Sequence, residues 1–459
     1  MLRLGLVFWA KDRFAPADDG SFYHVVAQRI AHGAGYTWLW PDGAVSYAAH
    51  YPVGYPALLG LVYALFGSRP AVAMVANAVL GAFAVFAGQR AVALRGTRRQ
   101  ALLAGLLLAL HPGLVCYTPA LMTEGVSAEL LVIAAWLALR VGSGRGRLGR
   151  LALLGGCLGV LTLVRPQLLI LAPVFGFFSC TSGQPRYRER GLRALFVGLV
   201  AVAVCLPWTL RNCARMDRCV FVSANGGWNL LIGAIPEANG AWIPIEGATV
   251  PTECRNVFGE AEKDRCFGRA GLELIRRNPA RFLASVPRKL SITFDYFGAP
   301  GHYLHTSNAQ AFGDRGKFWL GVVETAWERL VLLLAIVQAA RLGTRRRPGG
   351  LIAALPAALF ALLRSGYLAY LGFVLSVVLS GKELLKRPLL ALSASTVLAT
   401  ALTHAVFFGA GRYGFVCAAL LCLAAAGEEE ARPAHREAPA RFRPNDSFDS
   451  HAKKRRYWR

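Results

Sequence analysis

Side chains that can do acid–base or phosphate chemistry occur in short groups along a chain otherwise rich in Leu, Ala, Val and Gly. Two adjacent carboxylates, Asp18 and Asp19, open the first group, and Tyr23 follows four residues after Asp19. A carboxylate can take a proton from an attacking hydroxyl or amine, and Arg binds phosphate through charge-assisted hydrogen bonds. The other candidates are His24, His50, Tyr51, Thr123, Glu124, Arg165, Arg364, Arg412 and Tyr413. These residue types fit a site that binds a phosphate and activates a nucleophile.

The composition indicates a protein that crosses a membrane many times. Of 459 residues, 55% are hydrophobic and only 17% are charged, and a single soluble core stops growing well below this length. The net charge of +25 is also compatible with nucleic-acid binding, but the cations sit in short clusters between apolar runs. Because no basic face interleaved with aromatic residues occurs, we expect membrane lipids and no nucleic acid among the partners.

Apolar windows recur along the chain. They lie near residues 70–90, 100–116, 119–139, 148–164, 166–180, 191–211, 319–340, 351–363, 366–380, 388–408 and 414–426. Several are shorter than the ~20 residues that a span perpendicular to the bilayer requires, so the ends of these windows are approximate. We expect an all-α polytopic membrane protein with about 11–13 transmembrane helices, amphipathic helices on the outer membrane surface and one long outer loop or domain.

Clusters of Arg and Lys decide which way the chain faces. Cytoplasmic loops are enriched in these residues, and five clusters alternate here with connections that carry at most one Arg each. The clusters lie at residues 90–99, 140–150, 186–193, 341–347 and 382–387. This alternation places residues 11–69 and 212–318 outside, and it makes the apolar stretch 51–67 a helix on the outer membrane surface.

The resulting organisation has six parts. Residues 1–10 supply only about half of a first transmembrane segment, so we expect the natural start of the protein to lie upstream. The other parts are a first outer loop at 11–69, a transmembrane bundle at 70–211, an extracytoplasmic domain at 212–318, a second bundle at 319–426 and a disordered cytoplasmic tail at 427–459.

The extracytoplasmic domain holds four of the ten cysteines. They are Cys213, Cys219, Cys254 and Cys266, and disulfides suit an oxidising compartment. The pairing Cys213–Cys219 with Cys254–Cys266 is one of the three connectivities that four cysteines allow. In the same domain we expect a helix that breaks at Pro279 and a second helix that leads towards Phe294.

Several segments resemble one group of membrane enzymes. They read, in order, "DGSFYHVVAQRIAHGAGY…HYPVGYPALLGLVYALFG", "ALHPGLVCYTPALMTEGVSAELL", "LTLVRPQLLILAP", "LPWTLRNCARMDRCVFVSANGGWNLLIGAIPEANGAW", "EAEKDRCFGRAGLELIRRNPARFLASVPRKL" and "HAVFFGAGRYGFVCAALL". Together they are similar to polyprenyl-phosphate-dependent glycosyltransferases of the multi-spanning class C fold, which include protein O-mannosyltransferases and lipid A aminoarabinose transferases. The resemblance runs from about residue 12 to residue 426 and is strongest to the bacterial branch.

The resemblance implies a catalytic carboxylate in the first outer loop. The spacing Asp-x-x-x-Tyr matches Asp19 and Tyr23, so Asp19 is the expected catalytic residue and Asp18 the second candidate. One helical turn separates Asp19 from Tyr23, so both would share a face. The structural alternative for Asp19 is the N-cap of a helix that begins at Ser21.

The resemblance also assigns the donor phosphate and its surroundings. Arg165, Arg412 and Tyr413 would face the phosphate, and Arg364 would help to hold it. Aminoarabinose transferases carry Lys-Pro-Pro where this chain reads Tyr51-Pro52-Val53-Gly54, so His50 or an Arg from another loop would replace the missing Lys. Acceptor positioning or support of the site is expected of Glu124, with capping of its helix as the alternative, and of Tyr23, His24 and Tyr51.

The function implied is transfer of a hexose or pentose from a polyprenyl-phosphate donor to a lipid, glycan or protein acceptor. We expect inversion at the anomeric carbon with Asp19 as general base, because only one well-placed carboxylate is evident. No cofactor is expected, although Asp18 and Asp19 can bind a divalent metal weakly. The expected location is the inner membrane of a bacterium, with the site facing the periplasm. A transporter or flippase for lipid-linked sugars, or a glycan polymerase or ligase, remains the alternative.

Overall fold

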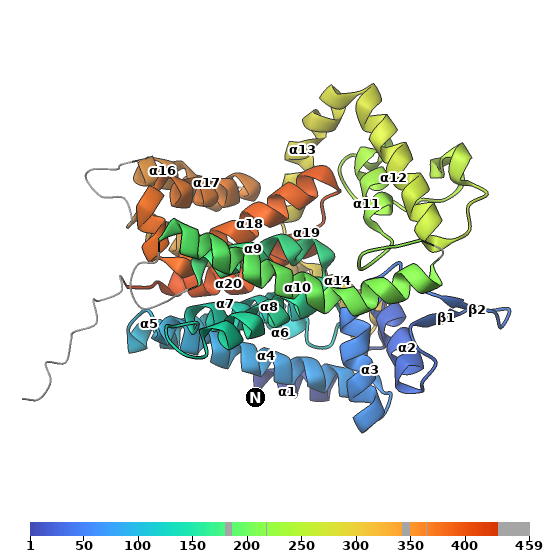
Figure 1. The fold of residues 1–459 in the computed structure, drawn as a ribbon, viewed down its shortest axis with the longest axis horizontal. Helices are drawn as coiled ribbons and strands as arrows, with labels where there is room; N and C mark the ends of the chain where they lie inside the picture. The colour runs from blue at the N-terminus through green and yellow to red at the C-terminus, as the bar shows by residue number, and fades with distance from the viewer. Residues whose placement is uncertain (180–185, 217, 342–348, 364, 430–459) are drawn as a thin grey trace, which may run out of the picture.

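The computed structural model describes residues 1–179, 186–216, 218–341, 349–363 and 365–429, and these residues are overwhelmingly helical (Figure 1). Most long helices run side by side along one direction, and the segments of the first outer loop gather at the same end of this bundle as the segments of residues 218–307 (Figure 1). Arg364 and all but the first three residues of the predicted tail 427–459 lie outside the described residues.

The first half of the bundle follows the predicted apolar windows. Its helices are α1 Leu2–Ala10, α4 Pro70–Ala93, α5 Arg98–Ala109, α6 Pro112–Cys116, α7 Thr123–Leu139, α8 Arg147–Val164, η1 Pro166–Ile170, α9 Leu171–Phe178 and α10 Tyr187–Arg215. Sequence signals set several of these ends. Pro70 opens α4 at a position where its missing N–H costs nothing, and Thr97 with Gln100 forms a reciprocal capping box before α5.

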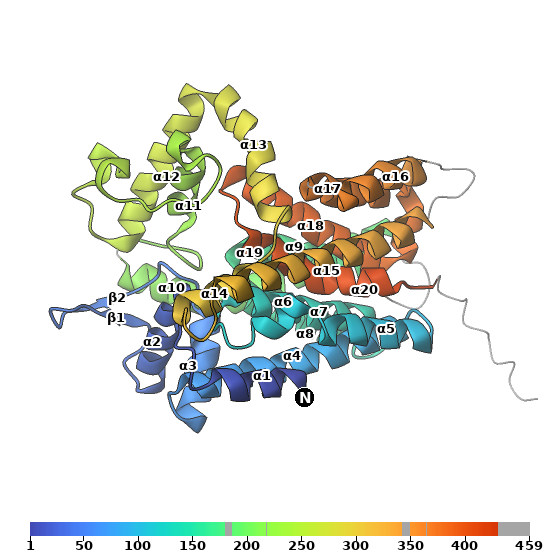
Figure 2. The same ribbon diagram turned by 180° about the vertical axis from the view of Figure 1, so that it is seen from behind.

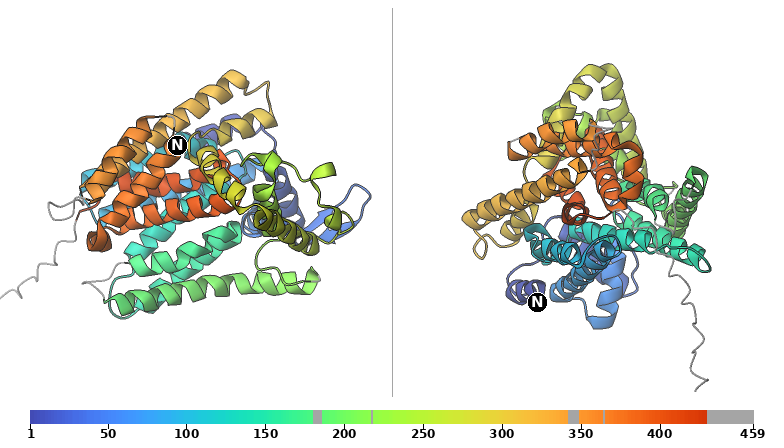
Figure 3. Two further views of the ribbon diagram at one scale, coloured as in Figure 1. Left: turned by 90° about the horizontal axis from the view of Figure 1, so that it is seen from above. Right: turned by 90° about the vertical axis from the view of Figure 1, so that its left-hand side faces the viewer.

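Small residues let α10 pack closely on α8. A Cβ at Gly155 would come within 2.7 Å of Val200 Cβ, and a Cβ at Gly159 within 2.6 Å of Val204 Cβ. This spacing of four is the small-x-x-x-small pattern that brings membrane helices together. Figure 3 shows α10 running along one flank of the bundle beside α8 and α9.

The second half of the bundle contains the C-terminal helices. They are α15 Asp314–Ala340, α16 Gly349–Leu362, α17 Gly366–Leu379, η5 Gly381–Lys386, α18 Pro388–Val406, α19 Gly411–Gly414, η6 Phe415–Cys417 and α20 Ala418–Ala426. Seen from behind, α15 crosses the bundle and packs against α20 and α6 (Figure 2). The helical polytopic architecture predicted from the sequence is therefore confirmed.

Four helices in the described part of the chain are long and apolar enough to cross a membrane, namely α4, α8, α10 and α18. Several other apolar helices are shorter, so the total of about 11–13 spans stays a prediction. On α10, Leu195, Leu199 and Leu206 are exposed, as expected for a helix that faces lipid. The chain is a helical membrane protein.

The segments predicted to lie outside the membrane, here called the outer segments, contain the remaining elements. They are α2 Asp19–Ala31, β1 Thr37–Leu39, β2 Val45–Tyr47, α3 Gly54–Phe66, α11 Gly226–Ala234, η2 Pro236–Ala238, η3 Gly247–Thr249, η4 Thr252–Cys254, α12 Glu260–Arg277, α13 Pro279–Phe294 and α14 Ala299–Ser307. The helix break expected at Pro279 is confirmed, since α12 ends and α13 begins there. The helix expected within residues 51–67 is α3.

A short hairpin stands among the helices of the first outer loop. Strands β1 and β2 pair antiparallel, with Thr37 opposite Tyr47 and Leu39 opposite Val45. The turn between them contains Asp42 and Gly43, and Gly43 has a φ of 85°, which favours glycine. An Asp-Gly pair between β-favouring residues is a recognised hairpin signal.

The two disulfides settle the connectivity that the sequence left open. Cys213 is bonded to Cys219 and Cys254 to Cys266. The second bond ties η4 to α12 beside the buried ring of Phe267, within a small apolar cluster that belongs to residues 228–274. Residues 228–274 thus have their own apolar core, which holds α11 and α12 together.

Candidate active site

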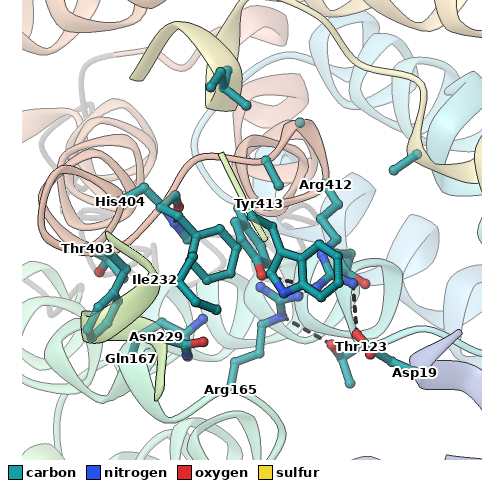
Figure 4. Close-up of a pocket in the computed structure, with 18 of the residues that line it drawn as sticks. Asp19, Thr123, Arg165, Gln167, Asn229, Ile232, Thr403, His404, Arg412 and Tyr413 are labelled. Carbon is teal, nitrogen blue, oxygen red and sulfur yellow. Dashed lines mark hydrogen bonds and ion pairs between the residues drawn. The ribbon is translucent and has the colours of Figure 1, made fainter. Parts of the chain in front are cut away.

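A cavity of about 1720 Å³ opens where the outer segments meet the bundle. Its walls come from the start of α2, the chain before α3, the N-terminus of α7, the α8–η1 junction, α11, α13, α14 and residues 403–413. Side chains of Asp19, Arg165 and Arg412, which come from three separate elements, converge there with Tyr413 and His404 beside them (Figure 4).

Asp19 is the first residue of α2, and its carboxylate is bonded on both oxygens. Oδ1 accepts a hydrogen bond from the Tyr51 hydroxyl at 2.7 Å, and Oδ2 accepts one from Arg412 Nη1 at 2.8 Å. The N-cap alternative for Asp19 is wrong, because Asp18 holds the N-cap position and α2 starts two residues before Ser21. The Asp19 side chain is 22% exposed and faces the cavity.

The surroundings keep Asp19 ionised. Burial by itself would raise the pKa of the carboxyl group, but the charge of Arg412 and the hydrogen bonds from Tyr51 and Arg412 outweigh burial and hold the pKa below its ordinary value. A carboxylate with a lowered pKa carries its charge throughout the neutral range. The Asp19 carboxylate can therefore accept a proton once its hydrogen bonds to Tyr51 and Arg412 are broken.

Arg412 connects most polar groups of the site. Besides Asp19, Nη1 donates to the Tyr303 hydroxyl at 3.0 Å, and Nη2 donates to the Tyr413 hydroxyl at 3.1 Å. Its Nε lies 3.7 Å from Glu124 Oε1. The planar guanidinium presents donors in several fixed directions, so one residue can face two tyrosine hydroxyls and two carboxylates.

Arg165 forms the second cation of the site. Nη2 donates to Glu124 Oε1, and Nε donates to Thr123 Oγ1 at 3.3 Å. The guanidinium of Arg165 lies 5.4 Å from the centre of the Tyr413 ring, and that of Arg412 lies 5.0 Å from it. Glu124 is buried, and its Oε2 has no hydrogen-bond partner among the residues that the structure describes. The Glu124 carboxylate therefore balances the charges of Arg165 and Arg412 and does not cap α7.

One protein family matches part of the chain. Residues 50–210 match the model of the dolichyl-phosphate-mannose-protein mannosyltransferase family. The chain is similar to these glycosyltransferases. The matched segment contains His50, Tyr51, Glu124 and Arg165, whereas Asp19 and Arg412 lie on either side of it.

A curated relative carries the same kind of name. Over 88 residues the chain is 43% identical to the undecaprenyl phosphate-alpha-4-amino-4-deoxy-L-arabinose arabinosyl transferase of Pseudomonas paraeruginosa (strain DSM 24068 / PA7). This match covers 19% of the chain and 16% of the relative, so it spans only a small part of that protein.

Two solved structures show more extended coverage at lower identity. The archaeal oligosaccharyltransferase AglB from Archaeoglobus fulgidus, in complex with an inhibitory peptide and a dolichol-phosphate, matches 90% of this chain and 46% of its own, with 13% identity and a TM-score of 0.40. ArnT from Cupriavidus metallidurans bound to undecaprenyl phosphate matches 93% of this chain and 76% of its own, with 17% identity and a TM-score of 0.39.

Three further predicted residues lie close to the site in different ways. His50 lines the cavity with its ring against Trp228, 5.2 Å between centres, and burial lowers its pKa. Tyr23 packs edge-on against Tyr51 at 5.5 Å and does not bond to Asp19 directly. Asp18 also lines the cavity, where its Oδ2 lies 3.5 Å from His302 Nε2.

His24 is placed away from this group. Its Nδ1 lies 2.7 Å from the Tyr63 hydroxyl on α3, and it is not among the residues that line the cavity. Burial lowers its pKa. His24 therefore ties α2 to α3, which is the packing role that a histidine on an interfacial helix commonly has.

Sequence reasoning missed two residues of the site. Tyr303 on α14 bonds to Arg412, and nothing in its sequence surroundings marks it. His404 stacks on Tyr413 with 4.3 Å between ring centres and 11° between planes, and its Nδ1 lies 2.8 Å from the Phe408 carbonyl oxygen. An ionisable residue at the end of an apolar span was the available signal for His404.

The described residues contain no group of three or more His, Cys, Asp and Glu side chains arranged to hold a metal ion. Asp18 and Asp19 are neighbours in sequence, but Asp19 is engaged by Tyr51 and Arg412 while Asp18 faces His302.

Proposed function

We propose that the protein transfers a sugar from a polyprenyl-phosphate donor to an acceptor hydroxyl at the extracytoplasmic face of a bacterial inner membrane. The observation that carries this proposal is the ion-pair network of Asp19, Arg412, Glu124 and Arg165 along one wall of a large cavity. The match of residues 50–210 to a lipid-phosphate-dependent mannosyltransferase family supports it. So does the name of the curated relative, which has an undecaprenyl phosphate donor.

The donor phosphate would lie against Arg165, Arg412 and Tyr413. Guanidinium groups bind phosphate through paired, charge-assisted hydrogen bonds, and their charge stabilises the lipid phosphate as it leaves. Both cations are already shared with carboxylates, Arg165 with Glu124 and Arg412 with Asp19. An arriving phosphate therefore competes with Asp19 for Arg412, and this competition would free the Asp19 carboxylate at the moment it is needed.

The transfer itself is a single displacement. The acceptor oxygen forms a bond to the anomeric carbon, its proton passes to Asp19, and the bond between that carbon and the phosphate oxygen breaks. The polyprenyl phosphate leaves with the electron pair of the broken bond. The acceptor attacks opposite the leaving group, so the configuration inverts. Asp18 lies beside His302 and is not needed as a second nucleophile.

The reaction as written uses side chains alone, and we propose no cofactor for it. Weak divalent-metal binding at Asp18 and Asp19 belongs to the proposal as a modulating effect. Activity measured with EDTA and then with added Mg²⁺ or Mn²⁺ checks it. A change of more than about tenfold would mean that a metal carries part of the leaving-group stabilisation now assigned to Arg165 and Arg412.

The competing transport function has one structural feature in its favour, the ionisable residues deep in the bundle. Four of these residues lie opposite each other in two pairs: Arg3 Nη1 lies 2.7 Å from Glu129 Oε1, and His111 Nε2 lies 3.2 Å from Glu328 Oε1. All four side chains are buried. Because none of these four residues lines the cavity, we favour transfer over transport.

The test supplies the purified protein in proteoliposomes with radiolabelled polyprenyl-phosphate sugars and a panel of lipid, glycan and protein acceptors. Transfer predicts label in a new glycosylated product and free polyprenyl phosphate in equal amount. Movement of intact lipid-linked sugar across the bilayer without product would support the transporter. Label that grows into a long glycan would support a polymerase or ligase.

A further inference from the structure

Lys289 is a fully buried cation that the mechanism above does not use. It lies on α13, and its Nζ is 3.4 Å from the carbonyl oxygen of Ala405 and 3.3 Å from that of Val406. The Phe282 ring lies 4.0 Å from the same Nζ. Lys289 does not line the cavity. Burying an ammonium group costs free energy, so a buried lysine is expected to have a structural or functional role.

The two carbonyl groups belong to the last turn of α18. The final carbonyls of a helix have no partner within the helix, and a cation placed there stabilises both the carbonyls and the helix dipole. Lys289 therefore fixes the point at which α18 ends. The chain then turns through residues 407–410 and enters the short helix α19, which carries Arg412.

Two glycines allow this connection to pack directly against α13. A Cβ at Gly409 would come within 2.1 Å of the Lys289 carbonyl oxygen, and one at Gly411 within 2.5 Å of the Tyr296 carbonyl oxygen. Gly409 also donates its N–H to the Gly240 carbonyl oxygen at 2.8 Å. The segment before Arg412 is thus held between α13 and the loop at Gly240.

The same last turn of α18 reaches the site through His404. That ring is stacked on Tyr413, whose hydroxyl accepts a hydrogen bond from Arg412. A shift in the end of α18 would therefore move the aromatic stack and the Arg412 guanidinium together.

We propose that Lys289 is a positioning residue, which holds the end of α18 and thereby sets Arg412 and Tyr413 in the geometry that binds the donor phosphate. This inference rests on the proposed function for its effect on catalysis. The positioning itself is a property of the fold and can be measured without substrate.

A titration supplies an independent readout. Burial lowers the pKa of Lys289 to about 8. The ammonium form carries the charge that stabilises the two carbonyl groups, so this local interaction weakens as the pH rises through about 8. By linkage, the lowered pKa makes the free energy of unfolding increase with pH between about 8 and the ordinary value of 10.5, so a loss of activity in that range reports on the local interaction and not on global unfolding. Arg288 on α13 and His404 on α18 are the neighbouring ionisable groups. The ordinary pKa of a histidine lies below pH 7 and that of an arginine above pH 12, so the change near pH 8 is assigned to Lys289.

The experiment compares Lys289→Met, which keeps an unbranched apolar side chain but lacks the ammonium group, with Lys289→Arg, which keeps the charge and the donors. Lys263→Met is the matched control, because Lys263 on α12 also faces an aromatic ring, that of Phe267 at 6.0 Å, but lies outside the cavity. Hydrogen exchange of residues 404–413 is measured in the full-length protein, together with kcat and KM for sugar transfer from pH 6 to pH 10.

Lys289→Met should raise exchange of residues 404–413 at least tenfold and lower kcat on the order of 10²-fold, since small misplacements of catalytic groups have effects of that size. Lys289→Arg should restore both to within about threefold of the wild type and remove the loss of activity above pH 8. Lys263→Met should match the wild type.

Equal exchange and kcat in Lys289→Met and the wild type would overturn the inference, as would the same losses in Lys263→Met. If Lys289→Met does not fold, an alkaline limb at pH 8 that persists in Lys289→Arg also overturns it. If the wild type transfers no sugar, the proposed function fails. The exchange data then still decide the positioning role, because they require no substrate.

Discussion

Arg–carboxylate ion pairs occur in two different parts of this molecule. In the bundle, Arg3 and Glu129 form a closed pair: Arg3 Nη1 also lies 3.3 Å from Thr118 Oγ1, and a Cβ at Gly81 would meet the guanidinium at 2.3 Å. At the cavity, Arg412 is shared among Asp19, Glu124, Tyr303 and Tyr413, and Glu124 Oε2 has no partner among the described residues.

The difference separates structural charge from functional charge. Both groups use the same residue types, but the interior pair is enclosed by close packing, whereas the outer network borders a cavity and retains unused hydrogen-bonding capacity. A ligand can join the second and not the first. Changes at the interior pair should therefore act on stability, and changes at the outer network should act on transfer.

The largest effect is expected at Asp19. Asp19→Asn keeps the shape and both hydrogen bonds in altered form but cannot take the acceptor proton, so kcat should fall about 10³- to 10⁴-fold. The measurement is the initial rate of product formation at equal protein, with thermal unfolding as the control for folding. A rate within tenfold of the wild type would remove Asp19 from the role of base.

The interior pair gives the next largest effect, on stability alone. Glu129→Gln leaves Arg3 buried without its counter-charge, which costs about 3–5 kcal/mol. The midpoint of unfolding should fall, while kcat per folded molecule stays within about twofold. The double variant Arg3→Met with Glu129→Met should recover most of the stability, and a loss of kcat there would erase the distinction between the two groups.

Arg412→Lys should lower kcat/KM about 10²-fold. Lysine keeps the charge but not the planar fork that reaches Asp19, Tyr303 and Tyr413 at once. Arg315 in the first turn of α15, outside the network, supplies the matched Arg→Lys control and should be near-neutral. Comparable losses in both variants would point to a general effect on the outer surface.

Tyr51→Phe should have the smallest effect, about three- to tenfold in kcat. The Tyr51 hydroxyl helps to lower the pKa of Asp19, so its removal raises that pKa. Transfer needs the ionised carboxylate and is lost as pH falls through the pKa, so the acid limb of the pH–rate profile should move to higher pH in the variant. An acid limb that stays in place would separate Tyr51 from the ionisation of Asp19.

The helices follow from patterns that lie within short stretches of sequence, and the clusters of Arg and Lys between them predict an outer position for the candidate residues. Apolar windows predict helices because burial in lipid demands satisfied backbone groups, and Pro279 ends α12 because proline removes a hydrogen bond. Cys254 and Cys266 are close enough in sequence to pair, but only the fold selects this connectivity.

The partners inside the site are a matter of tertiary structure. Asp19 and Arg412 are 393 positions apart, and no local sequence pattern predicts their contact. The same holds for Tyr303. Tyr23 shares a helix face with Asp19 as predicted, yet the hydroxyl that bonds to Asp19 belongs to Tyr51, because the chain before α3 brings that ring alongside α2. Spacing defines a face, whereas packing of neighbouring segments decides which group on it is bonded.

The central claim is that Asp19 and the donor phosphate share Arg412. Equilibrium binding of undecaprenyl phosphate to the wild type and to Asp19→Asn tests it directly. Because the neutral amide competes less strongly than the carboxylate for the guanidinium, Asp19→Asn should bind undecaprenyl phosphate as tightly as the wild type or up to about tenfold more tightly, while its rate of transfer falls about 10³-fold or more. Binding that is clearly weaker in Asp19→Asn, or unchanged by Arg412→Lys, would contradict the account.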